Sequence, residues 1–297
     1  MSAAPGAFAQ ATGGQVVPTV ASLIAASGVG ASEGAILAAT ALGCTREWLL
    51  AHDRDPLEDG AASGLIALLE LRRSGMPIAY ILGEREFYDL SFEVSRDVLI
   101  PRPETELLVD LAIEAAGHCG VRILDLGTGS GAIAITLAHR LTLAEVTAVD
   151  ASAHALRQAA RNAQRIGVQV QFALSDWYEA LSGQRFDLIL SNPPYIRRSD
   201  LHLKAGDLRY EPQLALVSGE DGLDAMRKVI QGAPAHLQPG GRLLVEHGYD
   251  QGAAVRALFA QTGFTEPLTT RDLAGVDRVC SAVWFGGSGL EPLKDAP

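Results

Sequence analysis

Short apolar runs alternate with helix-like apolar patterns between residues 121 and 286. Runs of this length, closed by glycine, proline or polar residues, are typical of buried strands. Strands that alternate with helical patterns predict a parallel sheet covered by helices, which is an α/β fold. The expected strands span 121–126, 145–149, 170–174, 186–190 and 242–245, with helices at 132–139 and 223–237 and a closing antiparallel pair at 265–271 and 278–285.

The first part of the chain has a helical pattern instead. Residues 19–44 carry a single charge, Glu33, but they are mostly Ala, Gly and Ser and follow no positive segment. They therefore predict two short helices rather than a signal peptide or a membrane span. Helical patterns at 47–52 and 56–73 extend this region, which we expect to end near Leu82 as a small helical domain.

The domain limits follow from these patterns. Alternating apolar residues predict a hairpin within 86–100 that links the helical domain to the α/β domain. The first residues lack periodicity and predict a flexible leader, and the last residues resemble a tail. The expected segments are leader 1–18, helical domain 19–82, hairpin linker 83–103, α/β domain 104–286 and tail 287–297.

The tetrapeptide Asn192-Pro193-Pro194-Tyr195 directly follows the strand at 186–190 and Ser191. Proline has no backbone N–H, so consecutive prolines leave carbonyl oxygens without competing donors. Asn192 can offer its side-chain carbonyl and Pro193 its backbone carbonyl to an NH₂ group, while Tyr195 can place its ring against the planar group that carries it. These residues predict an acceptor-lined cup for an amide or exocyclic amine. Taken alone, they are equally compatible with an ordinary turn.

A glycine-rich loop, Gly127-Thr128-Gly129-Ser130-Gly131, connects the strand at 121–126 to the helix at 132–139. Glycines allow a ligand to approach the backbone closely, and the start of the helix offers N–H groups. The loop lacks the Gly-Lys-Ser/Thr of a phosphate-binding P-loop. It also departs from the dinucleotide fingerprint, because Ala132 and Ile133 stand where the third spaced glycine would fall.

Two further strand ends carry groups suited to a nucleoside. Asp150 lies 23 residues after Gly127, where a ribose-binding carboxylate is expected, and its oxygens can accept two hydroxyls. After the strand at 170–174, Asp176 could accept from an adenine amino group and Trp177 could cover the ring, although a lone tryptophan is by default a core residue. Because ligands of open α/β sheets bind outside the carboxyl ends of the strands, we expect these groups, the glycine loop and the cup to meet at one edge.

With these motifs, residues 121–286 resemble a class I S-adenosylmethionine-dependent methyltransferase. Over residues 45–286 the chain is similar to the bacterial release-factor glutamine methyltransferase family, on the segments Gly83–Phe87, Leu99–Glu106, Asp125–Ala134 and Ser191–Ile196. The resemblance implies a Rossmann-like, mostly parallel seven-stranded sheet with a small N-terminal helical domain and a β-hairpin linker. It also implies S-adenosyl-L-methionine as cofactor and, as methyl acceptor, the glutamine amide in the Gly-Gly-Gln loop of peptide chain release factors.

The resemblance also implies roles for residues. Gly127 to Gly131, Asp150, Trp177 and Asn192 match cofactor-binding positions, and Asn192 to Tyr195 match the substrate cup. Methyl transfer from a sulfonium is an in-line displacement, so placement of the two groups carries most of the catalysis. We hypothesise that Asn192 and the Pro193 carbonyl each accept one amide N–H, in bonds that strengthen as positive charge grows on nitrogen. The motif contains no strong general base, and the sequence leaves the fate of the last proton open, with loss to solvent as one route.

Composition favours a cytoplasmic enzyme. The net charge of −11 argues against affinity that depends on phosphate contacts, and residues 1–90 hold five arginines, no lysine and ten acids, so no direct nucleic-acid contact is expected. Cys44, Cys119 and Cys280 are far apart and odd in number, which suggests neither a disulfide framework nor a zinc site. No metal is expected.

Two further segments carry candidate functional groups. Residues 197–222 form a long polar loop, with Arg197 and Arg198 at its start, that is a candidate for covering substrate. Glu246-His247 has the composition of a catalytic pair, but its position at the end of the strand at 242–245 favours a structural role for His247.

Three other functions share these features. A methyltransferase for adenine in DNA also uses an Asn-Pro-Pro-Tyr cup, but it needs a basic target-recognition region, and none is evident. A glutamine methyltransferase of a ribosomal protein has the same cup. It differs in the helical domain, which in this chain carries less charge than is usual in the family. A cofactor-binding module that docks on translation proteins without catalysis is the non-enzymatic alternative, and the intact cup argues against it.

Overall fold

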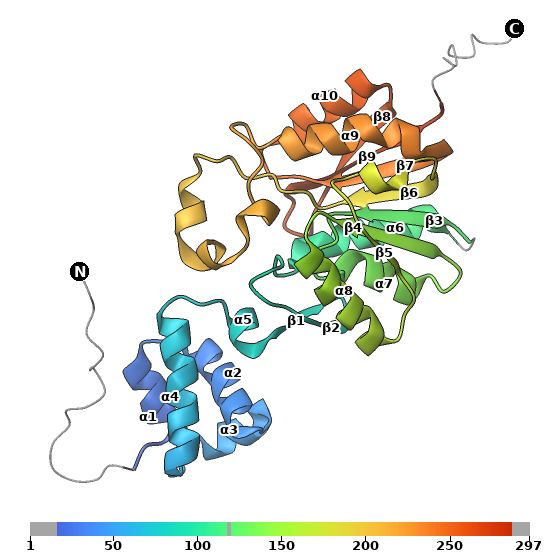
Figure 1. Ribbon diagram of the computed structural model, residues 1–297. Coiled ribbons are helices and arrows are strands. Elements are labelled where there is room, and N and C mark those ends of the chain that lie inside the picture. Colours follow the sequence, from blue (N-terminus) through green and yellow to red (C-terminus); the bar gives the residue numbers. More distant parts are fainter. Residues whose placement is uncertain (1–16, 118–119, 287–297) are drawn as a thin grey trace, which may run out of the picture. The chain divides into compact units, whose positions relative to one another are not determined.

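The computed structural model describes residues 17–117 and 120–286. Cys119, most of the expected leader and the expected tail lie outside these residues. The chain divides after Leu82 into two compact units, a helical unit and an α/β unit (Figure 1). Within the described residues, no helix is long and apolar enough to cross a membrane.

The helical unit packs its helices around a core that includes Leu37, Leu65 and Leu69. Side-chain hydroxyls cap the first and third helices, since Thr19 accepts from the Ser22 N–H and Thr45 from the Trp48 N–H. The helices are α1 (Val20–Ser27), α2 (Ala31–Leu42), α3 (Arg46–His52), α4 (Asp59–Arg73) and α5 (Ile78–Leu82).

The two short helices expected within 19–44 are confirmed. The helix expected from residue 56 begins later, at Asp59. The reason is that Pro56 forms a β-bridge with Thr19, and the Leu57 N–H donates to the Pro18 carbonyl at 2.8 Å. This extended pairing holds residues 56 and 57 outside the helix.

The α/β unit contains one seven-stranded sheet in the order β5-β4-β3-β6-β7-β9-β8. The strands are β3 (Arg122–Leu126), β4 (Glu145–Asp150), β5 (Gln171–Leu174), β6 (Phe186–Ser191), β7 (Leu237–Glu246), β8 (Thr265–Arg271) and β9 (Asp277–Trp284). β3 to β7 pair in parallel, and β9 is antiparallel to both β7 and β8. The mostly parallel seven-stranded sheet and its closing antiparallel pair are therefore confirmed.

Helices cover both faces of the sheet (Figure 1). The sheet residues alternate between two cores: Ile123 packs in the core of α6, α7 and α8, and Leu124 in the core of α9 and α10. The first group comprises α6 (Glu106–Ala116), α7 (Ala132–Arg140) and α8 (Ala153–Ile166), and the second α9 (Asp224–His236) and α10 (Gly252–Thr262).

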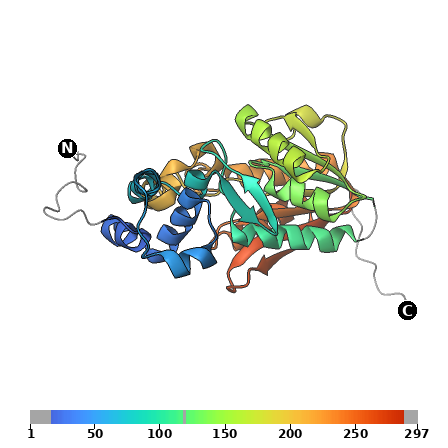
Figure 2. The same cartoon turned by 90° about the horizontal axis from the view of Figure 1, so that it is seen from below.

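A β-hairpin is confirmed, as β1 (Glu84–Phe87) and β2 (Leu90–Glu93), which begins and ends earlier than the expected 86–100 and belongs to the α/β unit that starts at Gly83. It lies beside the helices of the α/β unit (Figure 2). Asn162 on α8 accepts from the Glu93 N–H at 2.8 Å, and its amide nitrogen donates to the Glu93 carbonyl at 3.0 Å and to the Ser130 carbonyl at 2.9 Å. One buried side chain therefore attaches the hairpin to the glycine loop.

Candidate active site

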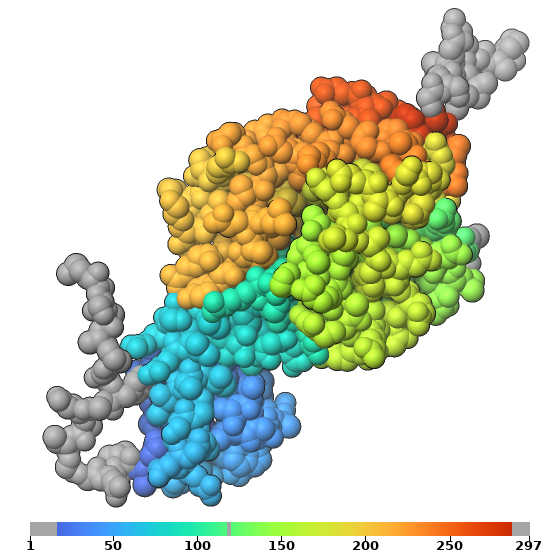
Figure 3. All heavy atoms as spheres, in the orientation of Figure 1, coloured from blue at the N-terminus to red at the C-terminus, as the bar shows by residue number. Residues whose placement is uncertain are grey.

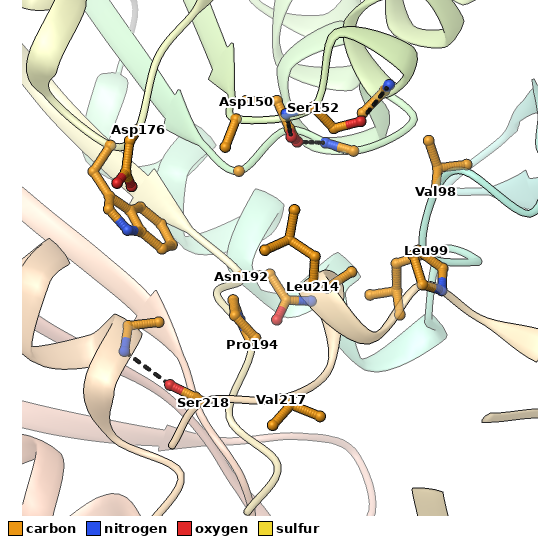
Figure 4. A pocket seen from close by; sticks show the side chains of 18 of the residues that line it. Val98, Leu99, Asp150, Ser152, Asp176, Asn192, Pro194, Leu214, Val217 and Ser218 are labelled. Carbon is orange, nitrogen blue, oxygen red and sulfur yellow. Dashed lines mark hydrogen bonds between the residues drawn. The ribbon is translucent and has the colours of Figure 1, made fainter. Parts of the chain in front are cut away.

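A cavity of about 500 Å³ lies at the carboxyl ends of β3 to β6. Its size falls within the range of small-molecule sites. In the space-filling view, a hollow separates the orange surface of α9 and the segment before it from the green surface of α8 (Figure 3). Asp150, Asp176, Asn192, Leu99 and Leu214 surround the cavity from different segments of the chain (Figure 4).

The glycine loop lines this cavity through Gly127 and Gly129. Both have left-handed backbone angles, with φ of 75° and 58°, which glycine adopts without a steric cost. Gly131 has another role. A Cβ there would lie 2.6 Å from Ile135 Cδ1 and 3.1 Å from Ala159 Cβ, so this glycine allows α7 to begin against α8. Gly131 is not among the cavity-lining residues.

Thr128 and Ser130 are buried and do not line the cavity. The Thr128 hydroxyl donates to Asp125 Oδ2 at 2.7 Å, while Asp125 Oδ1 is buried and has no hydrogen-bond partner among the described residues. Burial raises the pKa of Asp125 to about 7, against the lowering effect of the Thr128 bond. A carboxyl next to a glycine loop with a raised pKa and only one hydrogen-bonded oxygen is more typical of a functional site than of a hydrophobic core.

Asp150 lies in the cavity wall with its carboxylate already oriented. Its Oδ2 accepts from the Gly129 N–H at 2.9 Å and its Oδ1 from the Ser152 N–H at 2.8 Å. Burial raises the pKa of Asp150, and these two bonds oppose the shift. Because each carboxylate oxygen has two lone pairs, both can still accept a ligand hydroxyl.

Asp176 and Trp177 also line the cavity. Trp177 has a left-handed φ of 52°, which is strained for a residue with a bulky side chain, and the Ser175 hydroxyl donates to its carbonyl at 2.8 Å. A Cβ on Gly127 would lie 3.9 Å from Trp177 Cζ3, so the indole is next to the glycine loop. The Asp176 carboxylate pairs with Lys228 at 3.6 Å.

The predicted cup lies where the large cavity adjoins a smaller one of about 60 Å³. Asn192 lines both cavities, Pro194 lines the large one, and Pro193 and Tyr195 line the small one together with Arg102. The Asn192 amide nitrogen donates to Thr105 Oγ1 at 3.0 Å. A ligand in the large cavity and a second group in the small cavity would therefore meet at Asn192.

The segment 197–222 lies along the large cavity and contains three short 3₁₀ turns, at Leu201–Lys204, Gly206–Tyr210 and Gln213–Ala215. Glu211, which is buried, fixes it to the strand-helix connection before α6. Its Oε2 accepts from the Ile100 N–H at 3.0 Å, and its Oε1 pairs with Arg102. Leu214 and Val217 then contribute to the cavity wall.

His247 is fully buried and lines neither cavity. Its Nδ1 is 2.8 Å from the Gly248 carbonyl, and burial lowers the pKa of the imidazole. These contacts fit the structural role expected from its position. Within the described residues, no group of His, Cys, Asp and Glu could hold a metal ion.

Several residues of the site were not predicted. Ser152 and Lys228 line the cavity, Glu211 fixes the segment beside it, and Thr105 orients Asn192. Ser152 follows Asp150 closely and could have been found as its partner. Thr105 and Glu211 reach the site from distant parts of the chain, and no local pattern marks them.

Each of the two units matches the model of a known domain family. Residues 20–83 match the model of the PrmC N-terminal domain, and residues 103–207 match that of the methyltransferase small domain. The release factor glutamine methyltransferase of Bordetella pertussis is 51% identical over 86% of this chain and 96% of that protein, and that of Xylella fastidiosa strain Temecula1 is 53% identical over 80% and 88%.

Solved structures agree on the fold. The 16S rRNA N2 G1207 methyltransferase of T. thermophilus, in complex with AdoMet and guanosine, has a TM-score of 0.52 at 22% identity, covering 68% of this chain and 49% of that one. A methyltransferase from Pyrococcus furiosus has a TM-score of 0.51 at 19% identity, covering 67% and 91%. With the sequence identities above, these findings show that the chain belongs to the release factor glutamine methyltransferase family.

Proposed function

We propose that the protein transfers a methyl group from S-adenosyl-L-methionine to the side-chain amide nitrogen of the glutamine in the Gly-Gly-Gln loop of peptide chain release factors. The observation that carries the proposal is the place of Asn192 on the boundary between a large and a small cavity. The large cavity suits the cofactor, and the small cavity suits one planar amide. The family of the chain supports the same acceptor.

The large cavity fits the cofactor in its donor set. Asp150 presents carboxylate lone pairs where a ribose would lie, Trp177 offers an aromatic wall, and Gly127 and Gly129 allow close approach of the backbone. Asp176, which pairs with Lys228 in the same cavity wall, accepts from the adenine amino group in this proposal. When bound, S-adenosylmethionine supplies an electrophilic methyl group on a sulfonium.

The cup residues act on the acceptor. Asn192 Oδ1 and the Pro193 carbonyl each accept one N–H of the glutamine amide, which orients the nitrogen lone pair toward the methyl group. Those bonds strengthen as the nitrogen becomes positive, so they stabilise the transition state more than the bound amide. Tyr195 lines the small cavity and remains protonated, since burial raises its pKa well above the ordinary value.

Other acceptors have less support. The cup is common to both families of enzyme, so it does not distinguish a release factor from a ribosomal protein as acceptor. The match of residues 20–83 to the PrmC N-terminal domain favours the release factor. The net charge of −11 disfavours DNA. We propose that the helical unit contributes to release-factor recognition and that the enzyme works in the cytoplasm, where its substrate acts.

The test uses purified protein, S-adenosylmethionine and release factor that carries no methyl group, followed by mass spectrometry of the Gly-Gly-Gln peptide. We expect that peptide to gain the mass of one methyl group, located on the glutamine side chain. A release factor with that glutamine replaced by alanine is the control and should gain nothing. Normal cofactor binding without any gain on the wild-type factor would contradict the proposed acceptor.

A further inference from the structure

Gln251 connects three parts of the α/β unit that lie far apart in the sequence. Its side-chain nitrogen donates to the Tyr195 carbonyl at 3.0 Å and to the Gly222 carbonyl at 3.3 Å, and its Oε1 accepts from the Gly248 N–H at 2.9 Å. Gln251 is 5% exposed. Its side chain therefore joins the end of the cup, the end of the segment 197–222 and the connection between β7 and α10.

These partners fix the direction in which the Gln251 amide faces. A backbone N–H donates and a carbonyl accepts, so Gly248 requires the amide oxygen, while Tyr195 and Gly222 require its two N–H groups. A reversed amide would place like against like at all three contacts. Gly222 permits the close approach: its φ is 79°, and a Cβ there would lie 2.5 Å from the Tyr195 oxygen and 2.7 Å from Gln251 Nε2.

The Tyr195 carbonyl is the second of two fixed points around the cup. The first is Ser191, the last residue of β6, whose hydroxyl donates to a backbone carbonyl of β3 at 2.8 Å. Asn192, Pro193 and Pro194 lie between these points, and the two proline rings fix φ. Few rotations remain, so a shift of the Tyr195 carbonyl moves the Pro193 carbonyl and Asn192 with it.

The effect on the reaction rests on the proposed function, in which Asn192 and the Pro193 carbonyl orient the acceptor nitrogen. We propose that Gln251 is a positioning residue that holds the cup in the geometry for methyl transfer by fixing the Tyr195 carbonyl. Gln251 lines neither cavity, so it acts through the cup and not by contact with a ligand. Because small displacements of reacting groups are costly in rate, the contact should matter for kcat.

Cofactor binding should depend little on Gln251. The helix α9 follows Gly222 closely and contributes to the wall of the large cavity. Its own position is determined by the core, because Met226 and Val229 are fully buried against the sheet. Loss of the Gln251 contact should therefore disturb the cup more than the large cavity.

The experiment compares Gln251→Glu and Gln251→Leu with the wild type. Gln251→Glu nearly keeps the size of the side chain and can still accept from Gly248, but its ionised carboxylate offers no donor to the two carbonyls. Gln251→Leu removes all three hydrogen bonds. At saturating cofactor and acceptor, each should lower kcat roughly 10-fold, while the Kd for S-adenosylmethionine stays within about twofold.

Gly222→Ala tests the same contact from the other side, with Gly240→Ala as its matched control. The new Cβ at position 222 would displace the Tyr195 carbonyl. Gly240 has a φ of 84° and, among the described residues, no contacting atom lies within 4 Å of its Cβ position. Gly222→Ala should lower kcat roughly 10-fold and Gly240→Ala should leave it unchanged. Combining Gly222→Ala with Gln251→Leu should add little, because both act on one carbonyl.

Hydrogen exchange tests the contact without an acceptor. Directly after the cup, the Ile196 N–H donates to the Leu216 carbonyl and the Arg198 N–H to the Gly219 carbonyl, both at 2.9 Å. In Gln251→Leu, peptides that cover residues 195–222 should exchange faster than in the wild type, and peptides that cover the glycine loop should not. Wild-type protein that methylates no release factor would count against the proposed function alone, because the exchange result still shows whether Gln251 holds the cup.

Three results would overturn the proposal. The first is a wild-type kcat in both Gln251→Glu and Gln251→Leu. The second is unchanged exchange over residues 195–222 in Gln251→Leu. The third is a lower kcat accompanied by an equal rise in the Kd for S-adenosylmethionine and a lower melting temperature, which would indicate a general loss of structure rather than a displaced cup.

Discussion

The two sides of the candidate active site are assembled in different ways. The glycine-loop side depends on contacts between residues close in sequence: Thr128 bonds to Asp125 three positions away, and Gly129 to Asp150 over 21 positions. The cup side depends on distant ones. Asn192 bonds to Thr105 over 87 positions, and the Tyr195 carbonyl accepts from Gln251 over 56 positions at 3.0 Å.

We expect this difference in construction to separate cofactor binding from methyl transfer. The glycine-loop side is formed mainly by one strand, one turn and the next strand end, with Asn162 and Ala159 of α8 as additional contacts. We therefore expect its geometry to depend less on distant segments than that of the cup. The cup lies where several segments converge, and small shifts in any of them move Asn192. We therefore expect changes on the glycine-loop side to alter cofactor affinity, and changes on the cup side to alter the rate of transfer.

The largest effect is expected from Asn192→Ala. Removing one preorganised hydrogen-bonding group from a transition state costs about 10²- to 10³-fold in kcat. Cofactor affinity should change little, because Asn192 is only one of the many residues that line the large cavity. Single-turnover methylation and calorimetric titration with S-adenosylmethionine measure the two quantities separately. An equal loss in both would place Asn192 on the cofactor side and remove the contrast.

Asp150→Ala should have the opposite profile. It removes a carboxylate that orients Gly129 and that we expect to accept ribose hydroxyls, so the Kd for S-adenosylmethionine should rise about 10- to 100-fold. At saturating cofactor kcat should remain within a few-fold. Asp176→Ala is the matched control in the same cavity. Its carboxylate is half exposed and pairs with Lys228 at 3.6 Å, so its effect should be several times smaller. Equal effects would contradict a special role for Asp150.

The same difference explains what could be predicted from sequence. The positions of the parallel strands along the chain, the glycine loop and the cup could be predicted, because each is a local pattern of apolar, glycine or proline residues. Asp150, Asp176, Trp177 and Asn192 do line the cavity, as expected from their places at strand ends. Their roles toward the cofactor and the acceptor remain predictions.

What could not be predicted lacks a local signal. The helix α8 buries mainly small or polar side chains, among them Ala159 and Asn162, so few large apolar residues mark its buried face in the sequence. The pairing of Asn192 with Thr105, and of Ile100 with Glu211 over 111 positions, depends on the folded topology. Glu246 was noticed only as the neighbour of His247, because nothing in the sequence indicates that its carboxyl is buried.

Gly131→Ala tests the local construction of the glycine loop. The new Cβ would lie 2.6 Å from Ile135 Cδ1 and 3.1 Å from Ala159 Cβ, at a φ of 86°. Gly167→Ala is a close control, because its φ is 83° and, in the part of the chain that the structure describes, no contacting atom lies within 4 Å of its Cβ position. The strain of the left-handed backbone is common to both, so Gly131→Ala should lower the free energy of unfolding by about 1–3 kcal/mol more than Gly167→Ala. Urea denaturation measures this, and equal losses would mean that α7 shifts to accept the methyl group.

The smallest effect is expected from Glu211→Gln. Glu211 contacts residues on the cup side and precedes residues that line the large cavity. The glutamine Oε1 can still accept from the Ile100 N–H, but Arg102 loses its charged partner. Arg102 lines the small cavity, and the residues after Glu211 line the large one, so looser attachment should raise both the KM for the acceptor and the Kd for the cofactor, by about two- to fivefold. Glu220→Gln is the control in the same segment. Its pair with Arg198 is 3.7 Å long and more than 70% exposed on both sides, so neither constant should change. If Glu211→Gln raised only the KM for the acceptor, the segment 197–222 would affect the cup and not the binding of the cofactor. Cofactor binding would then depend even more strongly on contacts between residues close in sequence.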